Sequence, residues 1–466
     1  MIKNKIVSNT TVSSDTVSAN KISFQVPTEN IIELDGQLVS FGIVPNQVKA
    51  HITIGRLPDI VVLPEFHNNK IPLTTIYFFS SIYSAKNKKP LTVIVQDENM
   101  SKNLKIYMEE NYRPHAIKNL DNLGSELLLD KSFLEKEYSY FDQFEKELDQ
   151  MINIITIDKS PISITQKENQ YTVGSKLFKS TELQAVNLTS IQNYSQLKNW
   201  HPRFGVITSG ISSGSYGNAP TTNMIVRYKF QDESKSLWID CGPQMKNFAV
   251  AGGESIQSVK VLITHGHEDH DAGLWELLLD DECRNIELIS HPIYLDSLQR
   301  KIAALGLSDK LAKVSTLSIT PRNENGEQNT LILDDLMITS EWAIHGLPTL
   351  SIKIENDYRN FIYSSDTATS SERLETLLSE GVIDSTRINQ LRQFFKEPKC
   401  DLFIEEQGAS LKDGVHVGDP NHNNSLDTIS PDNARIYRVV HFGDSNIHEI
   451  AEEFRAKTME AIELIP

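Results

Sequence analysis

The sequence predicts an α/β fold, because short apolar strands alternate with helical segments along most of the chain. An apolar strand over Val259–Thr264 is followed by a helix over Leu274–Leu279, and a strand over Leu91–Val95 by a helix over Ser101–Tyr112. A polar cluster, His265–His270, comes directly after the first of these strands. A tight loop at a strand end points such side chains into one crevice at the edge of the sheet. We therefore expect layered α/β domains whose chemistry lies at a sheet edge.

The composition is that of an ordinary globular protein with a large acidic excess. The chain has 466 residues, of which 39% are hydrophobic and 23% charged, so it can build more than one core, in two to four domains. Its formal net charge of −17 opposes nonspecific binding to nucleic acid, which needs a basic surface. RNA is therefore a disfavoured partner unless a local basic patch exists.

Compartment is indicated by the cysteines and by the N-terminus. The three cysteines, Cys241, Cys283 and Cys400, are far apart and odd in number, which disfavours a disulfide framework. Residues 1–20 are rich in Ser, Thr and Asn without an apolar core, so we expect a flexible tail and no signal peptide. No apolar run is long enough to span a membrane. We expect a cytoplasmic monomer or homodimer.

Residues 21–200 are expected to form an N-terminal α/β domain. Its opening strands, Ile22–Val26 and Gln37–Phe41, carry alternating apolar residues, and the hairpin dipeptide Asp35–Gly36 precedes the second. The remaining expected elements are a buried strand over Asp59–Leu63, a helix over Thr74–Ser84, and a long amphipathic helical stretch over Leu129–Ile155.

Residues 201–466 are expected to form a second, catalytic domain. It opens with a small-residue strand, Phe204–Thr208, and a Ser/Gly-rich loop, Ser209–Gly217. Strands over Asn223–Phe230 and Ser236–Asp240 follow before the strand that leads into the polar cluster. Alternating strands and helices continue to the end of the chain.

The polar cluster is typical of a metal site. His265, His267, Asp269 and His270 place three imidazoles and a carboxylate within six residues. These ligands suit zinc, and also manganese or iron. Four potential ligands at this spacing predict two ions rather than one, and they disfavour the alternative of a solvated histidine-rich loop.

The two halves of the chain share a pattern at a constant offset. Gly42 and Gly242 each follow an apolar strand, and their separation is 242 − 42 = 200 positions. The same offset aligns Val61–Lys70 with Val261–His270 without a gap. The ligand positions of the first copy read Glu65, His67, Asn69 and Lys70. We interpret the first half as a degenerate copy that kept the fold and lost the metal; the alternative is chance similarity between two strand–loop segments.

The cluster resembles the HxHxDH signature of the metallo-β-lactamase superfamily, whose fold is an αββα sandwich. Within it the sequence is similar to the phosphodiesterase branch, which includes ribonuclease Z and cyclic-nucleotide phosphodiesterases. The opening strand and loop, residues 205–224, and the apolar strand ending in Asp240–Cys241–Gly242 resemble that branch too. The resemblance covers roughly Arg203 to the C-terminus.

This resemblance implies further ligands, each after an apolar strand and in the family's order: His345, Asp366 and His441. By analogy the ligands are divided between two ions, with His265, His267 and His345 on one, Asp269, His270 and His441 on the other, and Asp366 bridging them. Two divalent ions, zinc in the first instance, would activate a bound hydroxide and neutralise phosphate charge.

The resemblance also implies catalytic roles. Asp269 would orient the nucleophile as well as bind metal. Asp240 would hold an imidazole N–H, or else serve only as a turn residue. His422 would be the general acid, oriented by Glu405 or Glu406. His416 is a rival in the same loop, and the family's usual His–Ser/Thr pair is not matched.

We therefore expect a metal-dependent phosphodiester hydrolase acting on a cyclic or other small nucleotide. A ribonuclease Z-like tRNA 3′-end endonuclease is the alternative; the tandem layout favours it, whereas the acidic charge and the lack of a basic Gly/Pro-rich arm do not. The interval from His345 to Asp366 is only 366 − 345 = 21 positions, too short for an arm there. Lactone or thioester hydrolysis is a further alternative, and a non-catalytic sensor or binding role stays open.

Overall fold

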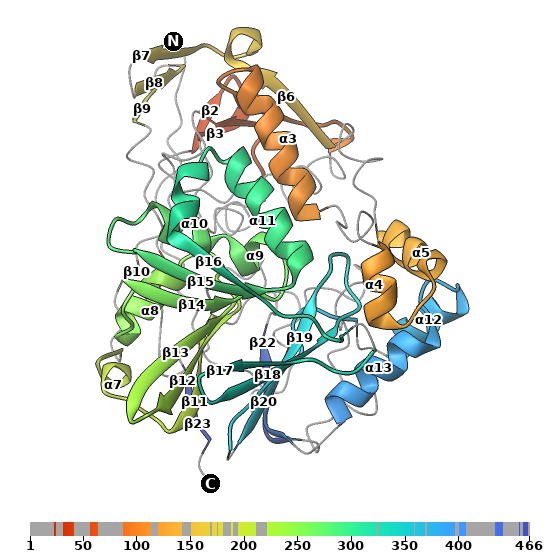
Figure 1. Ribbon diagram of the computed structural model, residues 1–466. Helices are drawn as coiled ribbons and strands as arrows, with labels where there is room; N and C mark the ends of the chain where they lie inside the picture. Colours follow the sequence, from red (N-terminus) through yellow and green to blue (C-terminus); the bar gives the residue numbers. More distant parts are fainter. Residues whose placement is uncertain are drawn as a thin grey trace. The chain divides into compact units, whose positions relative to one another are not determined.

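The structure, a computed structural model (Figure 1), describes the following residues: 23–24, 31–41, 56–63, 87–112, 120–141, 151–167, 170–174, 176–179, 188–189, 194–210, 221–323, 326–357, 359–368, 371–396, 400–406, 434–440, 456 and 460–464. The chain forms two compact units. Unit 1 comprises residues 1–111, 144–193 and 299–311, and unit 2 comprises residues 112–143, 194–298 and 312–466. The division into domains at residue 200 stays a prediction, since residues 112–143 cluster with unit 2.

Unit 2 contains two sheets. The first has the strand order β16-β15-β14-β13-β12-β11-β23 and the second β17-β18-β19-β20-β21-β22. The strands of the first sheet are β11 (Phe204–Gly210), β12 (Asn223–Phe230), β13 (Glu233–Ile239), β14 (Ser258–Leu262), β15 (Asn285–Ser290), β16 (Val314–Ser318) and β23 (Glu460–Glu463). Those of the second are β17 (Thr330–Leu333), β18 (Leu336–Trp342), β19 (Leu350–Glu355), β20 (Asn360–Tyr363), β21 (Cys400–Glu406) and β22 (Ala434–Val440).

One hydrophobic core joins these sheets. It takes Val226 from β12 and Leu237 from β13, together with Ile352 from β19 and Phe403 from β21. Helices pack on both sheets: α8 (Met245–Gly252) contacts β11, and α13 (Ser385–Lys396) contacts β18. The remaining helices of unit 2 are α4 (Leu120–Leu127), α5 (Lys131–Phe141), α7 (Tyr194–Lys198), α9 (Glu268–Asp271), α10 (Gly273–Leu279) and α12 (Ser371–Ser379). The expected αββα sandwich is confirmed.

Unit 1 is built on a five-stranded sheet with the order β2-β3-β4-β5-β6. These strands are β2 (Ile31–Leu34), β3 (Gln37–Phe41), β4 (Ile60–Leu63), β5 (Leu91–Val95) and β6 (Ile152–Thr156), and helix α3 (Glu98–Tyr112) follows β5. A three-stranded sheet of β7 (Ile164–Lys167), β8 (Gln170–Val173) and β9 (Lys176–Lys179) and a pair of β1 (Ser23–Phe24) with β10 (Leu188–Thr189) complete the described strands. Helix α11 (Pro292–Ala304) begins in unit 2 and ends in unit 1.

The two units repeat one strand pattern. In unit 1, β2 pairs antiparallel with β3, and β3, β4, β5 and β6 then pair in parallel. In unit 2, β12 pairs antiparallel with β13, and β13, β14, β15 and β16 pair in parallel. The interpretation of the first half as a degenerate copy stays a prediction. The altered ligand positions Glu65, His67, Asn69 and Lys70 lie outside the described residues.

The turn between β2 and β3 shows why the sequence signal for that hairpin was reliable. Asp35 and Gly36 both adopt left-handed backbone angles, with φ of 49° and 80°. A two-residue hairpin of this kind needs positive φ at both central positions, and Asp-Gly supplies it at low cost.

The long helix expected over Leu129–Ile155 is wrong in part. Helix α5 ends at Phe141, residues 142–150 lie outside the described part, and Ile152–Thr156 is strand β6, paired in parallel with β5. A run of β-branched residues packs well at the edge of a sheet, and pairing with β5 overrides the weak helical periodicity.

The expected helix over Thr74–Ser84 lies outside the described residues. Among the described residues, no helix is long and apolar enough to cross a membrane.

Candidate metal centre

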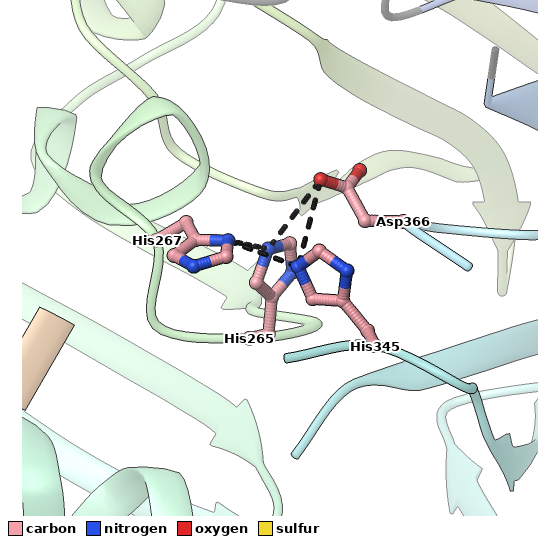
Figure 2. A group of neighbouring side chains, drawn as sticks. All are labelled: His265, His267, His345 and Asp366. Carbon is pink, nitrogen blue, oxygen red and sulfur yellow. Dashed lines mark hydrogen bonds and ion pairs between the residues drawn. The ribbon is translucent and has the colours of Figure 1, made fainter. Parts of the chain in front are cut away.

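The candidate metal ligands of unit 2 come from three strand ends (Figure 2). His265 and His267 follow β14, His345 follows β18, and Asp366 follows β20. His267 Nδ1 lies 3.0 Å from His265 Nε2 and 3.0 Å from His345 Nε2. Asp366 Oδ2 lies 3.7 Å from His265 Nε2 and 4.0 Å from His345 Nε2. Positions separated by about a hundred residues in sequence therefore converge on one point.

This geometry fits a divalent transition metal. One potential ligand atom from each of the four side chains lies within 4.8 Å of the others. Zinc–nitrogen bonds of about 2.0–2.1 Å in a tetrahedron separate ligand atoms by about 3.3 Å, inside the observed range. Burial lowers the pKa of His265 and of His267 well below the ordinary value. Both rings are therefore neutral near pH 7, the form in which an imidazole binds metal.

Asp366 faces a second group of candidate ligands through its other oxygen. Asp366 Oδ1 lies 3.3 Å from His270 Nε2, and Asp269 Oδ2 lies 4.0 Å from the same nitrogen. Asp366 and His270 are buried, whereas the Asp269 side chain is 21% exposed. The Asp366 carboxylate thus lies between His265 and His345 on one side and His270 on the other, as expected of a ligand that bridges two ions. The third candidate of the second group, His441, lies outside the described residues.

Asp240 orients His270. Its carboxylate accepts hydrogen bonds from the Thr264 amide at 2.8 Å, from the Thr264 hydroxyl at 2.9 Å and from His270 Nδ1 at 2.8 Å. With Nδ1 bonded to Asp240, Nε2 is the ring nitrogen that faces Asp366. The expectation that Asp240 holds an imidazole is thus confirmed. Burial lowers the pKa of His270, but the carboxylates of Asp366, Asp240 and Asp269 outweigh burial and raise that pKa well above its usual value.

The backbone around Asp240 explains the residue types found there. Asp240 itself has a left-handed φ of 59°, a conformation that Asp tolerates better than most residues. The Cys241 amide donates to the carbonyl of His270 at 2.6 Å. A Cβ on Gly242 would lie 1.9 Å from the carbonyl oxygen of Asp269, so only glycine fits. The end of β13 is in this way held against the ligand-bearing helix α9.

His345 and Asp366 are tied to each other through their neighbours. The Ile344 amide donates to the Thr367 hydroxyl at 3.2 Å, and the Ala368 amide donates to the Ile344 carbonyl at 2.8 Å. The Ser365 hydroxyl donates to Thr264 Oγ1 at 2.9 Å. The residues that follow Asp366 are therefore bonded to the residue that precedes His345, and the residue that precedes Asp366 is bonded to the residue that precedes His265.

Glu405 and Glu406 end strand β21 beside this centre. Both are buried, and the Glu406 carboxylate accepts a long hydrogen bond of 3.4 Å from the amide of Thr367. His422 and its rival His416 lie outside the described residues. The general-acid assignment to His422, with Glu405 or Glu406 as its orienting group, stays a prediction.

Sequence reasoning missed a set of side chains that hold the strand end before His345. The Glu126 carboxylate accepts hydrogen bonds from the Trp342 indole at 3.1 Å and from His291 Nε2 at 3.2 Å. Arg387 bonds to the carbonyl of Trp342 and to the carboxylate of Glu137. No local pattern identifies these residues, because they come from distant parts of the chain.

Comparison with known proteins agrees with this fold and motif. Residues 206–396 match the family model of the anti-Pycsar protein Apyc1. Two curated relatives come from Dictyostelium discoideum. The cGMP-dependent 3′,5′-cGMP phosphodiesterase A is 26% identical over 199 residues, which are 42% of this chain and 21% of that protein. The cAMP/cGMP-dependent 3′,5′-cAMP/cGMP phosphodiesterase B is 26% identical over 153 residues, 32% of this chain and 13% of that protein. The matched region thus spans 21% of the first relative and 13% of the second.

Solved structures align more weakly. The short form of human tRNase Z is 16% identical with a TM-score of 0.38, covering 56% of this chain and all 100% of the other. The metallo-β-lactamase fold protein YhfI from Bacillus subtilis is 15% identical with a TM-score of 0.39, covering 55% of this chain and 98% of the other. Over less than half of its length, the chain is thus similar in sequence to the Apyc1 family model and to 3′,5′-cyclic-nucleotide phosphodiesterases.

Proposed function

We propose that this protein is a metal-dependent phosphodiesterase that hydrolyses cyclic or other small nucleotides. The convergence of His265, His267, His345 and Asp366, with ligand atoms within 4.8 Å of one another, carries the proposal. Two divalent ions, when bound, lower the pKa of a water molecule and neutralise charge on a phosphodiester. Zinc is the first candidate, with manganese and iron as alternatives.

The chain's own residues then do the remaining work. Asp269 is the most exposed carboxylate of the candidate ligands and is suited to orient the attacking water. Asp240 keeps His270 in one tautomer, and the buried, hydrogen-bonded loops keep the carboxylate of Asp366 between the two groups. We propose His422 as the donor of the proton that the leaving alkoxide needs, with Glu405 or Glu406 holding its ring.

The substrate class is supported by the curated relatives and by charge. Both named relatives are 3′,5′-cyclic-nucleotide phosphodiesterases. The family model matches residues 206–396, which include the candidate ligands from His265 to Asp366. A net charge of −17 disfavours a large RNA substrate, whose binding depends on many phosphate contacts. A small nucleotide needs only local neutralisation by the metal centre.

A substrate panel tests the proposal. Purified protein loaded with zinc or manganese should hydrolyse 3′,5′-cGMP or 3′,5′-cAMP, and Asp269→Ala should lower kcat by about a hundredfold or more. The matched control is Asp281→Ala, an exposed aspartate in unit 2, which should keep wild-type activity. Cleavage of precursor tRNA at its 3′ end with no turnover of cyclic nucleotides would contradict the proposal. Lactone hydrolysis as the sole activity would also exclude it.

A further inference from the structure

We infer that α4 and α5 position the candidate ligand His345, and that Glu126, Glu137 and Arg387 are positioning residues of the metal centre. This inference rests on the proposed function, since it requires that His345 bind metal. The two helices precede His345 by about two hundred residues, yet they belong to the same compact unit. Glu126 of α4 bonds to Trp342 directly, and Glu137 of α5 acts through Arg387.

Arg387 makes the first connection. Its guanidinium, fully buried, donates from Nη1 to the carbonyl of Trp342 at 3.0 Å and from Nη2 to the carbonyl of Ala343 at 2.8 Å. It also donates from Nε and Nη2 to the two carboxylate oxygens of Glu137, at 3.2 Å and 3.0 Å. Ala343 stands two residues before His345. The planar guanidinium thus ties helices α5 and α13 to the backbone that leads into the ligand.

The charge on Glu137 is what allows this guanidinium to be buried. An isolated buried cation is strongly disfavoured, whereas one paired with a carboxylate is tolerated. Burial lowers the pKa of Arg387, but Glu137 outweighs burial and raises it. Arg387 therefore stays charged, and its bonds to the two carbonyls are charge-assisted.

Glu126 makes the second connection, from helix α4. Its carboxylate accepts hydrogen bonds from Trp342 Nε1 at 3.1 Å and from His291 Nε2 at 3.2 Å. The His291 ring packs edge-on against Trp342 with 4.5 Å between centroids. The side chain and the carbonyl of Trp342 are therefore both held, the first by Glu126 and the second by Arg387.

These contacts bear on metal binding because ligand geometry is strict. Metal–ligand distances in proteins stay within about 0.2 Å of their preferred values, so a small shift of the strand end weakens the site. His345 contributes a ring nitrogen 3.0 Å from that of His267 and has to keep this position.

A second buried pair in unit 2 offers a contrast. Arg227 pairs with Glu254 and donates to the carbonyls of Leu197, Trp200 and Gly252, none of which adjoins a candidate ligand.

The experiment compares Glu137→Gln with Glu254→Gln in the full chain. Metal affinity is measured by competition with a chromogenic chelator, ligand geometry by the visible spectrum of the cobalt-loaded protein, and stability by thermal unfolding. We expect both variants to unfold at lower temperature. Only Glu137→Gln should raise the Kd for metal, by about tenfold, and shift the cobalt spectrum. Glu135 is exposed on the same helix, and Glu135→Gln should change neither the metal affinity, nor the cobalt spectrum, nor the unfolding temperature.

Further variants separate positioning from stability. Arg387→Lys keeps the charge but loses the fork that reaches both carbonyls, so it should weaken metal binding as well. The apolar double replacement Glu137→Met with Arg387→Leu should regain thermal stability but not metal affinity. If Glu137→Gln fails to fold, the milder Glu126→Gln takes its place with the same expected change in Kd.

Two results would overturn the inference. Equal metal affinity and identical cobalt spectra in wild type, Glu137→Gln and Glu126→Gln would show that these residues only stabilise the fold. A wild-type protein that binds no transition metal would also overturn it, because His345 would then not be a metal ligand. A wild type that binds metal but hydrolyses no nucleotide would contradict the proposed function alone, because the inference is measured on binding.

Discussion

Asp240 illustrates how a single residue acts on a metal site that it does not itself enter. It sits in a left-handed conformation after β13, and its carboxylate joins Thr264 to His270. One oxygen satisfies the Thr264 amide and the other the imidazole N–H. The candidate ligand His270 is therefore presented in one orientation before any ion arrives, which is the benefit of a preorganised site.

Replacement of this residue makes a prediction at the same scale. Asp240→Asn should raise the Kd for metal by about 10–100-fold, because a neutral amide holds the imidazole N–H more weakly and turns an NH₂ group toward one of its donors. Isothermal titration of the metal-free protein with zinc measures the change. Exposed Asp281→Asn serves as the control. An affinity equal to that of wild type would show that Asp240 is only a turn residue.

Between elements, the close approach of β13 to α9 decides where the candidate ligands point. The Cys241 amide bonds to the His270 carbonyl at 2.6 Å, and Gly273 donates to the Cys241 carbonyl at 2.6 Å. Gly242 and Gly273 leave no room for a Cβ, which would meet backbone oxygens at 1.9 Å and 2.3 Å. The contact is thus backbone on backbone, and small residues are required on both sides of it.

Gly242→Ala tests this contact. The added methyl group meets the Asp269 carbonyl, which cannot move without displacing a ligand, so we expect a loss of about 3 kcal/mol in the free energy of unfolding. Gly306→Ala is the comparison, because a methyl group there meets no atom within 4 Å. It should cost only the backbone strain of a φ of 72°, about 1–2 kcal/mol in the free energy of unfolding. Urea unfolding measures both. A smaller loss for Gly242→Ala than for Gly306→Ala would argue against a tight contact.

For the whole molecule, the sequence order of the segments does not match their distribution between units. Residues 112–143 lie between two segments of unit 1 in sequence but cluster with unit 2. Leu134 and Tyr138 of α5 are fully or almost fully buried in the core that the two sheets of unit 2 share. Unit 1 has a separate core, which includes Val39, Ile60 and Ile94.

Two core substitutions test this organisation. Leu134→Ala should destabilise the protein by about 2–5 kcal/mol through the cavity that it leaves, and amides of β11–β13 should lose protection from hydrogen exchange. Ile94→Ala should have a comparable cost but expose amides of β3–β5 instead. Loss of protection in the strands of unit 1 after Leu134→Ala would contradict the assignment of α5 to unit 2.

The sequence by itself determined the fold class, the first four strands of unit 2, β11–β14, and the identity of the polar cluster that follows them. Val259–Thr264 and Asp35–Gly36 were predictable because apolar periodicity and turn chemistry act over a few residues. His345 and Asp366 were found through resemblance to a known family, and the structure brings both beside His265 and His267.

Tertiary structure alone decided the rest. Ile152–Thr156 became a strand because β5 lies beside it. Glu126 reaches Trp342 across 216 positions, Arg387 reaches Trp342 across 45, and Glu137 reaches Arg387 across 250. The sequence pattern around a residue does not identify partners this far away along the chain. A hydrogen bond across the core depends on where the folded chain places two distant residues, and only the packing of the sheets and helices sets that distance.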